Sequence, residues 1–178
     1  MTKKKLNKKI LDRVESRAYE LVEEYHGCAQ CSLHAIQEVC GFKDDLIGKA
    51  AVGLSGGVGG LGAACGALTG ASLALGLKYG REVSMLSGPA EEAIEQELAA
   101  VEPVARLGKW FERKFGSINC RDIRRSFAGT DLTRVVPWQE EWMEELGVPK
   151  KCAQLVAQTT RRAVAMLENP TLGITEEV

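Results

Sequence analysis

The six cysteines are the residues whose type and spacing point most directly to chemistry: Cys28, Cys31, Cys40, Cys65, Cys120 and Cys152. Four of them come where a helix is expected to begin, after a glycine or a polar turn: Cys28, Cys65, Cys120 and Cys152. The unpaired backbone N–H groups and the dipole of a helix N-terminus favour negative charge and lower the pKa of a thiol. This shared placement predicts thiolate chemistry.

A metal centre follows if these four cysteines converge, because grouped thiolates repel one another unless a cation or cluster holds them. Structural zinc commonly uses two short Cys-x-x-Cys pairs, whereas this chain has one pair and long intervals elsewhere. Iron–sulfur clusters accept four cysteines at varied spacing. We therefore favour an iron–sulfur cluster for electron transfer or redox sensing, with zinc as the alternative metal and these ligands: Cys28, Cys65, Cys120 and Cys152.

Thiol chemistry without a metal is the main alternative. Cys31 faces the same side of a helix as Cys28, so it is either an accessory ligand or part of a redox pair. A thiol–disulfide oxidoreductase or peroxide sensor would use Cys28, Cys31 and Cys65; a binding module with structural zinc is a third interpretation. Cys40 is expected to be a buried apolar thiol. No catalytic residue is assigned, so an oxidoreductase and an electron carrier both stay open.

Covalent haem is not expected, because Ser32 stands where a Cys-x-x-Cys-His motif would have its histidine. The glycine-rich stretch "GGVGGLGAACG" does not end in Gly-Lys-Ser/Thr, so it is not a phosphate-binding loop. We expect Gly60, Gly62 and Gly66 instead to let the backbone crowd the thiol site and donate N–H groups to sulfur.

Helical periodicity dominates the chain, and the predicted fold is all-α: a single compact helical bundle in which the glycine-rich loop leads into a buried central helix. Pro103 should break or kink the long amphipathic segment 89–115, whose apolar stripe includes Ile94, Leu98 and Val101. The helical segments are expected at 10–25, 28–40, 46–57, 63–78, 89–115, from 117 to Gly129, at 133–147, and from Pro149 to Pro170.

Length and composition predict one domain. It comprises a basic, flexible N-terminus (1–9), a helical redox or metal domain (10–170) and a loose tail (171–178). A net charge of −1 gives no field that would attract nucleic acid. The uncharged stretch 51–77 is interrupted by glycines, so no transmembrane segment is expected. Without a secretory signal, we expect a cytoplasmic protein, a homodimer formed through 89–115, and an unidentified redox protein partner.

The cysteine-bearing motifs resemble those of the C_GCAxxG_C_C family of redox-active proteins. The matching pieces are "GCAQCSL", "CGALTGASLALGLKYG", "FERKFGSINCRDI" and "KKCAQLVAQTTRRAV", within residues 15–168. The resemblance assigns the family's characteristic cysteines to Cys28, Cys65, Cys120 and Cys152, and makes Cys31 and Cys40 additions of this chain. It also implies a fold similar to the cysteine-bearing domain of the split-Soret type of dimeric haem cytochrome, for which an iron–sulfur centre has been proposed, without the haem.

Overall fold

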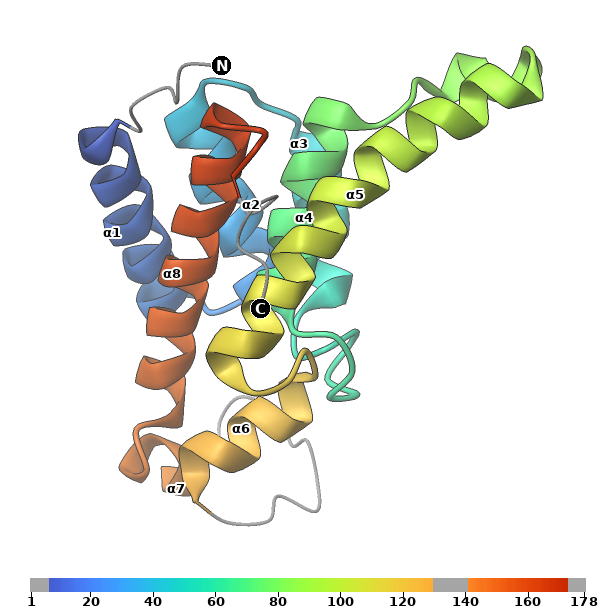
Figure 1. Ribbon diagram of the computed structural model, residues 1–178. Helices are drawn as coiled ribbons and strands as arrows, with labels where there is room; N and C mark the ends of the chain where they lie inside the picture. The colour runs from blue at the N-terminus through green and yellow to red at the C-terminus, as the bar shows by residue number, and fades with distance from the viewer. Residues whose placement is uncertain (1–6, 130–140, 173–178) are drawn as a thin grey trace.

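The computed structural model describes residues 7–129 and 141–172, and within these ranges the chain forms helices and no β-strand (Figure 1). The predicted all-α fold is confirmed. The long helices are α1 (Lys8–Tyr25), α2 (Cys28–Cys40), α4 (Gly66–Tyr79), α5 (Ala90–Phe115) and α8 (Val148–Glu168). The short ones are α3 (Asp45–Ala50), α6 (Cys120–Ala128), α7 (Glu141–Glu145), and the 3₁₀ turns η1 (Ala51–Leu54) and η2 (Val83–Ser87).

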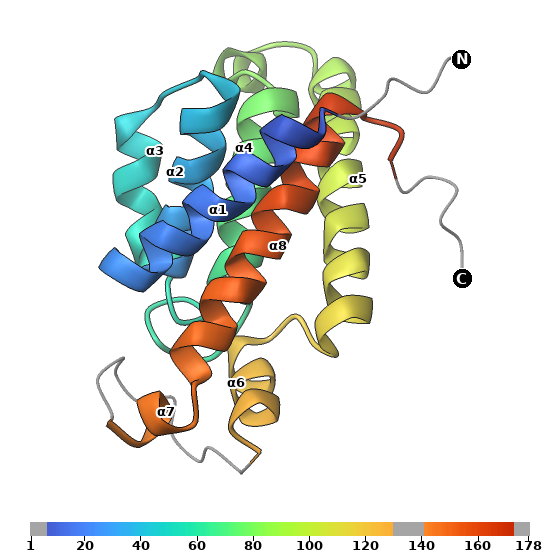
Figure 2. The ribbon, with the colours of Figure 1, turned by 90° about the vertical axis from the view of Figure 1, so that its left-hand side faces the viewer.

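The core lies between α1, α2, α4 and α8, which pack against one another with α5 against α4 (Figure 2). α1 presents a buried face to α8, with apolar side chains at three- and four-residue steps. Outside this seam, Arg161 of α8 binds Asp12 and Glu15 of α1, at 2.7 and 2.8 Å. The two ends of the chain are thereby held together, and Cys28 and Cys152 belong to helices of one bundle.

α4 is the buried central helix that the sequence predicts. It is apolar on every side over most of its length, and seven of its residues are buried: Gly66, Ala67, Leu68, Gly70, Ala71, Ala74 and Leu75. Glycines set its distance from α2, because a Cβ at position 70 would overlap the backbone carbonyl of Ala29. None of the helices in the described parts of the chain is long and apolar enough to span a bilayer.

α5 is one continuous helix whose apolar face is exposed over its first half. It runs through Pro103 without a break, although the ring leaves the carbonyl of Ala99 without its helical N–H donor. Its N-terminal half projects beyond α4 (Figure 1), and there Ile94, Leu98 and Val101 are exposed. Periodicity identifies an apolar face; it does not say whether the same chain covers that face.

The ends of the chain are more ordered than predicted. Asn7 caps α1 by accepting hydrogen bonds from the amides of Lys9 and Ile10, so the helix takes in the last two residues of the predicted flexible segment 1–9. Leu172, in the predicted loose tail, packs against the core, and its carbonyl accepts a 2.6 Å hydrogen bond from Arg106. The rest of these predictions, and most of the predicted stretch 133–147, lie outside the described residues: 1–6, 130–140 and 173–178.

Candidate functional site

Cys28 and Cys65 lie at two helix starts that touch. Cys28 is the first residue of α2, after Gly27 in the left-handed conformation, and Cys65 is the N-cap of α4. Cys28 Sγ rests against Gly66, at a place where any Cβ on residue 66 would overlap the sulfur. The close approach of α2 and α4 therefore brings these two thiols near each other.

Cys120 is joined to Cys65 through the backbone. The amide of Cys65 donates to the carbonyl of Ile118 at 2.8 Å, and the amide of Cys120 donates to that of Ala63 at 2.7 Å. These bonds form one isolated antiparallel bridge, Ala64 to Asn119, between the end of the glycine-rich loop and the start of α6. A piece of strand-like pairing in an all-helical chain thus fixes two cysteines side by side.

Cys152 lies in α8, which is distant from the other three cysteines in the sequence but packs beside them in the fold. α8 begins at Val148, one residue before Pro149, so Cys152 is its fifth residue and lies one turn inside the helix. The sequence predicts Cys152 in the first turn of this helix, and that prediction is wrong. A proline is accommodated at the start of a helix because no amide donor is needed there. The helix therefore includes Pro149 and begins one residue before it.

The four cysteines interact electrostatically, which shows that the fold brings them together. Burial raises the pKa of Cys65 well above its ordinary value, and negative charge on Cys28, Cys120 or Cys152 raises it further. Burial, followed by the charges of Cys120 and Cys28, raises the pKa of Cys152 to about 12. Four thiols this close, two of them buried and two half-buried, are stable as neutral groups and resist becoming thiolates unless positive charge arrives.

Backbone N–H groups oppose this cost at two sulfurs, and at Cys65 the group is the amide of Ala67. Burial raises the pKa of Cys28, while the amides of Gly56, Ala29 and Gly66 lower it by directing N–H groups at the sulfur. Gly56 was not among the glycines that the sequence singled out. It contributes because it takes a positive φ of 69°, which the sequence position alone does not reveal.

Of the three glycines chosen from the sequence, Gly66 directs its amide at a sulfur, whereas the prediction is wrong for Gly60 and Gly62, whose amides donate to carbonyls of the loop. Gly66 touches Cys28, as described. The carbonyl of Gly62 accepts a hydrogen bond from the amide of Arg121 at 3.0 Å, so Gly62 helps to hold the α6 start. The amide of Gly60 donates to the carbonyl of Ser55 within the loop itself, and open space surrounds the position where its Cβ would be.

Arg124 is the functional residue that the sequence analysis missed. It is 5% exposed, its guanidinium donates to Met143 Sδ at 2.6 Å, and it also hydrogen-bonds the Cys120 side chain, which lowers the pKa of that thiol against the effect of burial. No carboxylate within the described ranges pairs with it. Its position four residues after Cys120, on the same face of α6, was the available signal.

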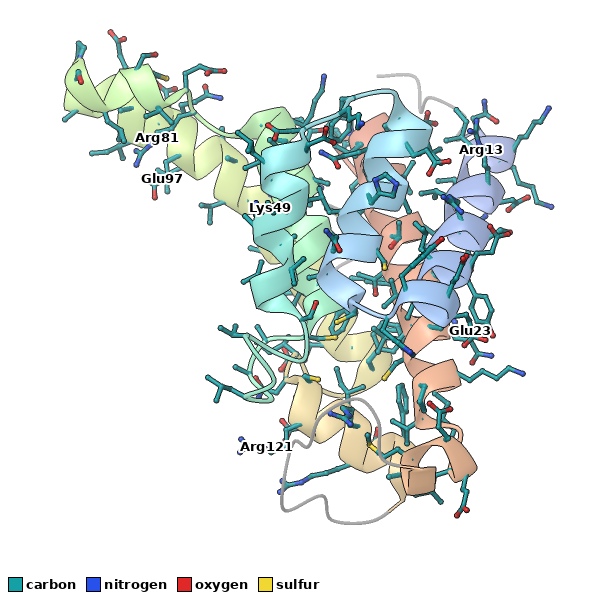
Figure 3. All side chains as sticks on the ribbon, turned by 180° about the vertical axis from the view of Figure 1, so that it is seen from behind. Arg13, Glu23, Lys49, Arg81, Glu97 and Arg121 are labelled. Atoms are coloured by element: carbon teal, nitrogen blue, oxygen red, sulfur yellow. The ribbon has the colours of Figure 1, made fainter. Side chains whose placement is uncertain are left out.

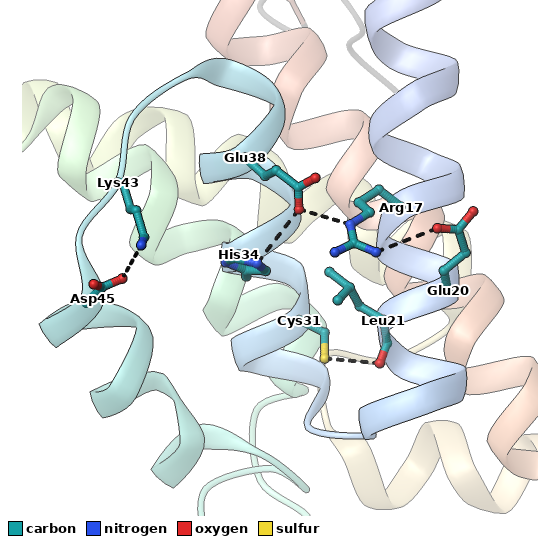
Figure 4. A network of polar contacts seen from close by, with 8 residues as sticks. All are labelled: Arg17, Glu20, Leu21, Cys31, His34, Glu38, Lys43 and Asp45. Atoms are coloured by element: carbon teal, nitrogen blue, oxygen red, sulfur yellow. Dashed lines mark hydrogen bonds and ion pairs between the residues drawn. The ribbon is translucent and has the colours of Figure 1, made fainter.

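Cys31 neighbours Cys28, and its thiol is taken up by hydrogen bonds to the end of α1. Its thiol donates to the carbonyl of His26 at 2.7 Å and to that of Leu21 at 3.5 Å, at the end of α1 (Figure 4). Burial and then the charge of Cys28 raise the pKa of Cys31 to about 11. It is thus a protonated hydrogen-bond donor that fastens α2 to α1.

Cys40 and His34 do not join the site. Cys40 is exposed at the last residue of α2, so the prediction of a buried apolar thiol is wrong. Gly41 ends α2 there, and the side chain of Cys40 stays at the surface although it lies near Glu168 of α8. His34 faces Glu38 at 3.7 Å on the outer side of α2 (Figure 4).

A cavity of about 190 Å³ opens beside Cys152. It lies between the end of α1 and the starts of α7 and α8, and its lining includes His26, Arg124, Met143 and Cys152. In Figure 3, sulfur atoms gather where α6 meets the adjoining helix ends. The cavity gives solvent or a small molecule a route to the edge of the four-cysteine group.

A single metal ion would require the four sulfurs to lie at a defined short distance from one another. Four thiolates on one zinc ion, at about 2.3 Å each, place their sulfurs only about 3.8 Å apart. Among residues 7–129 and 141–172, no group of three or more His, Cys, Asp or Glu side chains is disposed to hold a single metal ion. The donor set nevertheless suits an anionic sulfur-ligated centre, because it offers four thiols, amide donors and one buried cation.

Comparison with known proteins now places the chain. The family model described as "Putative redox-active protein (C_GCAxxG_C_C)" matches residues 12–166. The chain belongs to this family. No curated protein and no solved structure matches it. The matched residues include the four cysteines that the fold brings together.

Proposed function

We propose that this C_GCAxxG_C_C protein binds an iron–sulfur cluster through Cys28, Cys65, Cys120 and Cys152, and serves electron transfer or redox sensing. The observation that carries the proposal is the convergence of these four thiols from four separate helices. A cluster supplies one-electron transfer, and its ligands sit farther apart than those of a single ion.

The surrounding residues support this choice by the charge that they supply. Four thiolates add negative charge to a buried space, and the amides of Gly56 and Gly66 together with the guanidinium of Arg124 oppose it. Arg124 lacks a carboxylate partner within the described residues, so an anionic centre would satisfy an otherwise costly buried cation. Cys152 lines the cavity, which makes it the ligand best placed to face a redox partner.

The thiol–disulfide alternative is less well supported. A reactive redox cysteine needs a lowered pKa and access to solvent, whereas burial raises the pKa of both Cys28 and Cys31. Cys31 is further committed to the carbonyl of His26. A single structural zinc ion would require the four sulfurs to close in on one point.

The test is anaerobic reconstitution of the full chain with ferrous iron and sulfide in a reductant. We expect a coloured protein with stoichiometric iron and acid-labile sulfide, whose visible absorption bleaches on reduction. Serine substitution of any of the four ligands should remove the colour, while Cys40→Ser, at the exposed end of α2, should retain it. A colourless wild-type protein that stays folded would overturn the proposal.

A further inference from the structure

The N-terminal half of α5 carries an uncovered apolar face. Ile94, Leu98 and Val101 are 53%, 64% and 51% exposed, and Ala93 is the one buried residue between positions 90 and 99. This half projects beyond α4, and Arg81 and Glu97 join it to the preceding segment (Figure 3). A helix with so little tertiary cover is marginal in water, so the face calls for a covering surface.

The same helix face continues into the C-terminal half of α5 with small residues. From Ile94 the face runs through Leu98 and Val101 at three- and four-residue steps, then reaches Ala105 and Gly108. Ala105 is exposed, and the position of a Cβ on Gly108 is open. One half of the face therefore offers large side chains and the other half offers room for them.

Charge reverses along α5 in the same way. Residues 90–105 contain five glutamates and no basic side chain, whereas residues 106–115 contain two arginines, two lysines and one glutamate. Glu91 and Glu95 flank the apolar face on the side where Lys109 and Arg113 flank its other half. A second α5 in the antiparallel direction would meet both the opposite charge and the complementary side-chain size, whereas a parallel one would meet neither.

We propose that two copies of this chain pair through α5 in antiparallel fashion, about a two-fold axis near Val101. Ile94 and Leu98 of each copy then lie against Ala105 and Gly108 of the other. Glu91 and Glu95 lie opposite Arg113 and Lys109 of the second copy. Such an isologous contact is closed by its own symmetry.

Glu102, which is next to Val101 and so close to the axis, fits this arrangement. Glu102 of each copy would approach its equivalent, and like charges there would repel. Arg106 of the same helix already binds Glu102 at 2.6 Å and neutralises it. The pairing therefore leaves no uncompensated charge at its centre.

Sedimentation velocity on the full chain across a dilution series tests the pairing. Leu98→Glu should raise the dimer dissociation constant by at least about tenfold, because each dimer contains the substitution twice. Leu46→Glu is the matched control, since Leu46 is 79% exposed on α3, away from this face. A wild-type protein that is monomeric throughout, or a Leu98→Glu dimer as tight as the control, would overturn the proposal.

Charge exchange tests the direction. Glu91→Lys with Glu95→Lys should weaken the dimer, as should Lys109→Glu with Arg113→Glu, and the four changes together should restore it. A parallel pair, or a contact elsewhere on the surface, would not be rescued by the combination. Failure of the rescue, with both double variants weakened, would rule out the antiparallel arrangement.

Cross-linking tests the register. In a Cys40→Ser background, Val101→Cys should form an intermolecular disulfide because the two copies of residue 101 face each other at the axis. Ile94→Cys should not, since its equivalent lies about 21 Å away along the helix pair. The reverse pattern would contradict the proposed axis.

Discussion

Cys28 Sγ occupies the space that a Cβ on residue 66 would need. The first turn of α4 can therefore meet the first turn of α2 only when residue 66 is glycine, and the Gly66 amide can then point at the sulfur. Close helix packing and the electrostatics of the candidate site depend on the same missing side chain.

Gly66→Ala should destabilise the protein and disturb the site together. We expect the free energy of unfolding to fall by about 1–3 kcal/mol, the usual cost of overpacking, and iron retention after reconstitution to fall as well. Urea denaturation and iron analysis measure the two effects. Gly76→Ala is the control on the same helix, because its Cβ meets open space; it should raise stability by up to about 1 kcal/mol.

Cys31 and Cys152 should separate structure from metal binding. Cys31→Ala removes a thiol that links α2 to the His26 carbonyl, so it should lower the free energy of unfolding by about 1–2 kcal/mol and leave iron content unchanged. Cys152→Ser should abolish a stable cluster. Loss of iron in both variants would return Cys31 to the ligand set.

The raised pKa values predict alkaline instability of the metal-free protein. In the unfolded chain these thiols titrate near 9.0, whereas in the folded chain the pKa is about 11 for Cys120 and about 12 for Cys152. Between these values the folded state retains protons that the unfolded state releases. Stability is therefore complete below about pH 9 and falls as the pH rises toward 11 or 12, by up to about 1.4 kcal/mol per pH unit for each thiol.

Urea titrations at about pH 8 and about pH 10 measure this slope. Cys152→Ala removes one titrating thiol and should reduce the loss of stability between the two conditions. An equal loss in wild-type protein and variant would show that Cys152 does not hold its proton in the folded state.

Arg124→Met should have opposite effects on the two forms of the protein. Arg124 is a buried cation with no carboxylate partner among the described side chains, so its removal should leave the metal-free form equally stable or more stable, by about 1 kcal/mol or more. In the loaded form the same change removes the cation nearest Cys120, so the cluster should be lost faster on exposure to a chelator. Arg121→Met, on the exposed side of α6, is the control and should change the chelation rate little.

Local signals in the sequence were enough to predict where several helices end. The predicted segment 28–40 matches α2 because Gly27 and Gly41 both take the left-handed conformation at its ends. The same reasoning located Gly116 and Gly129 after their helices. From these ends it was possible to choose the four cysteines that the fold brings together.

The remaining features depend on tertiary packing, which local patterns do not contain. Cys40 and Leu98 are as apolar as many buried residues, and they are exposed because the packing of the described helices leaves both at the surface. In the sequence Arg124 cannot be distinguished from a surface charge, because its burial depends on the packing of α6 against α8. The role of Gly56 as an amide donor to the Cys28 sulfur depends on the path of its loop, which the sequence does not specify.

Membership of Cys152 in the last long helix has a consequence for biosynthesis. Residue 28 is synthesised well before residues 148–168, so the group of four thiols can form only after α8 has been made. If the four thiols bind a cluster as proposed, the cluster cannot have its full set of ligands before that stage. A fragment that lacks α8 would keep three cysteines of the group and lose the helix that packs against α1, α2 and α4.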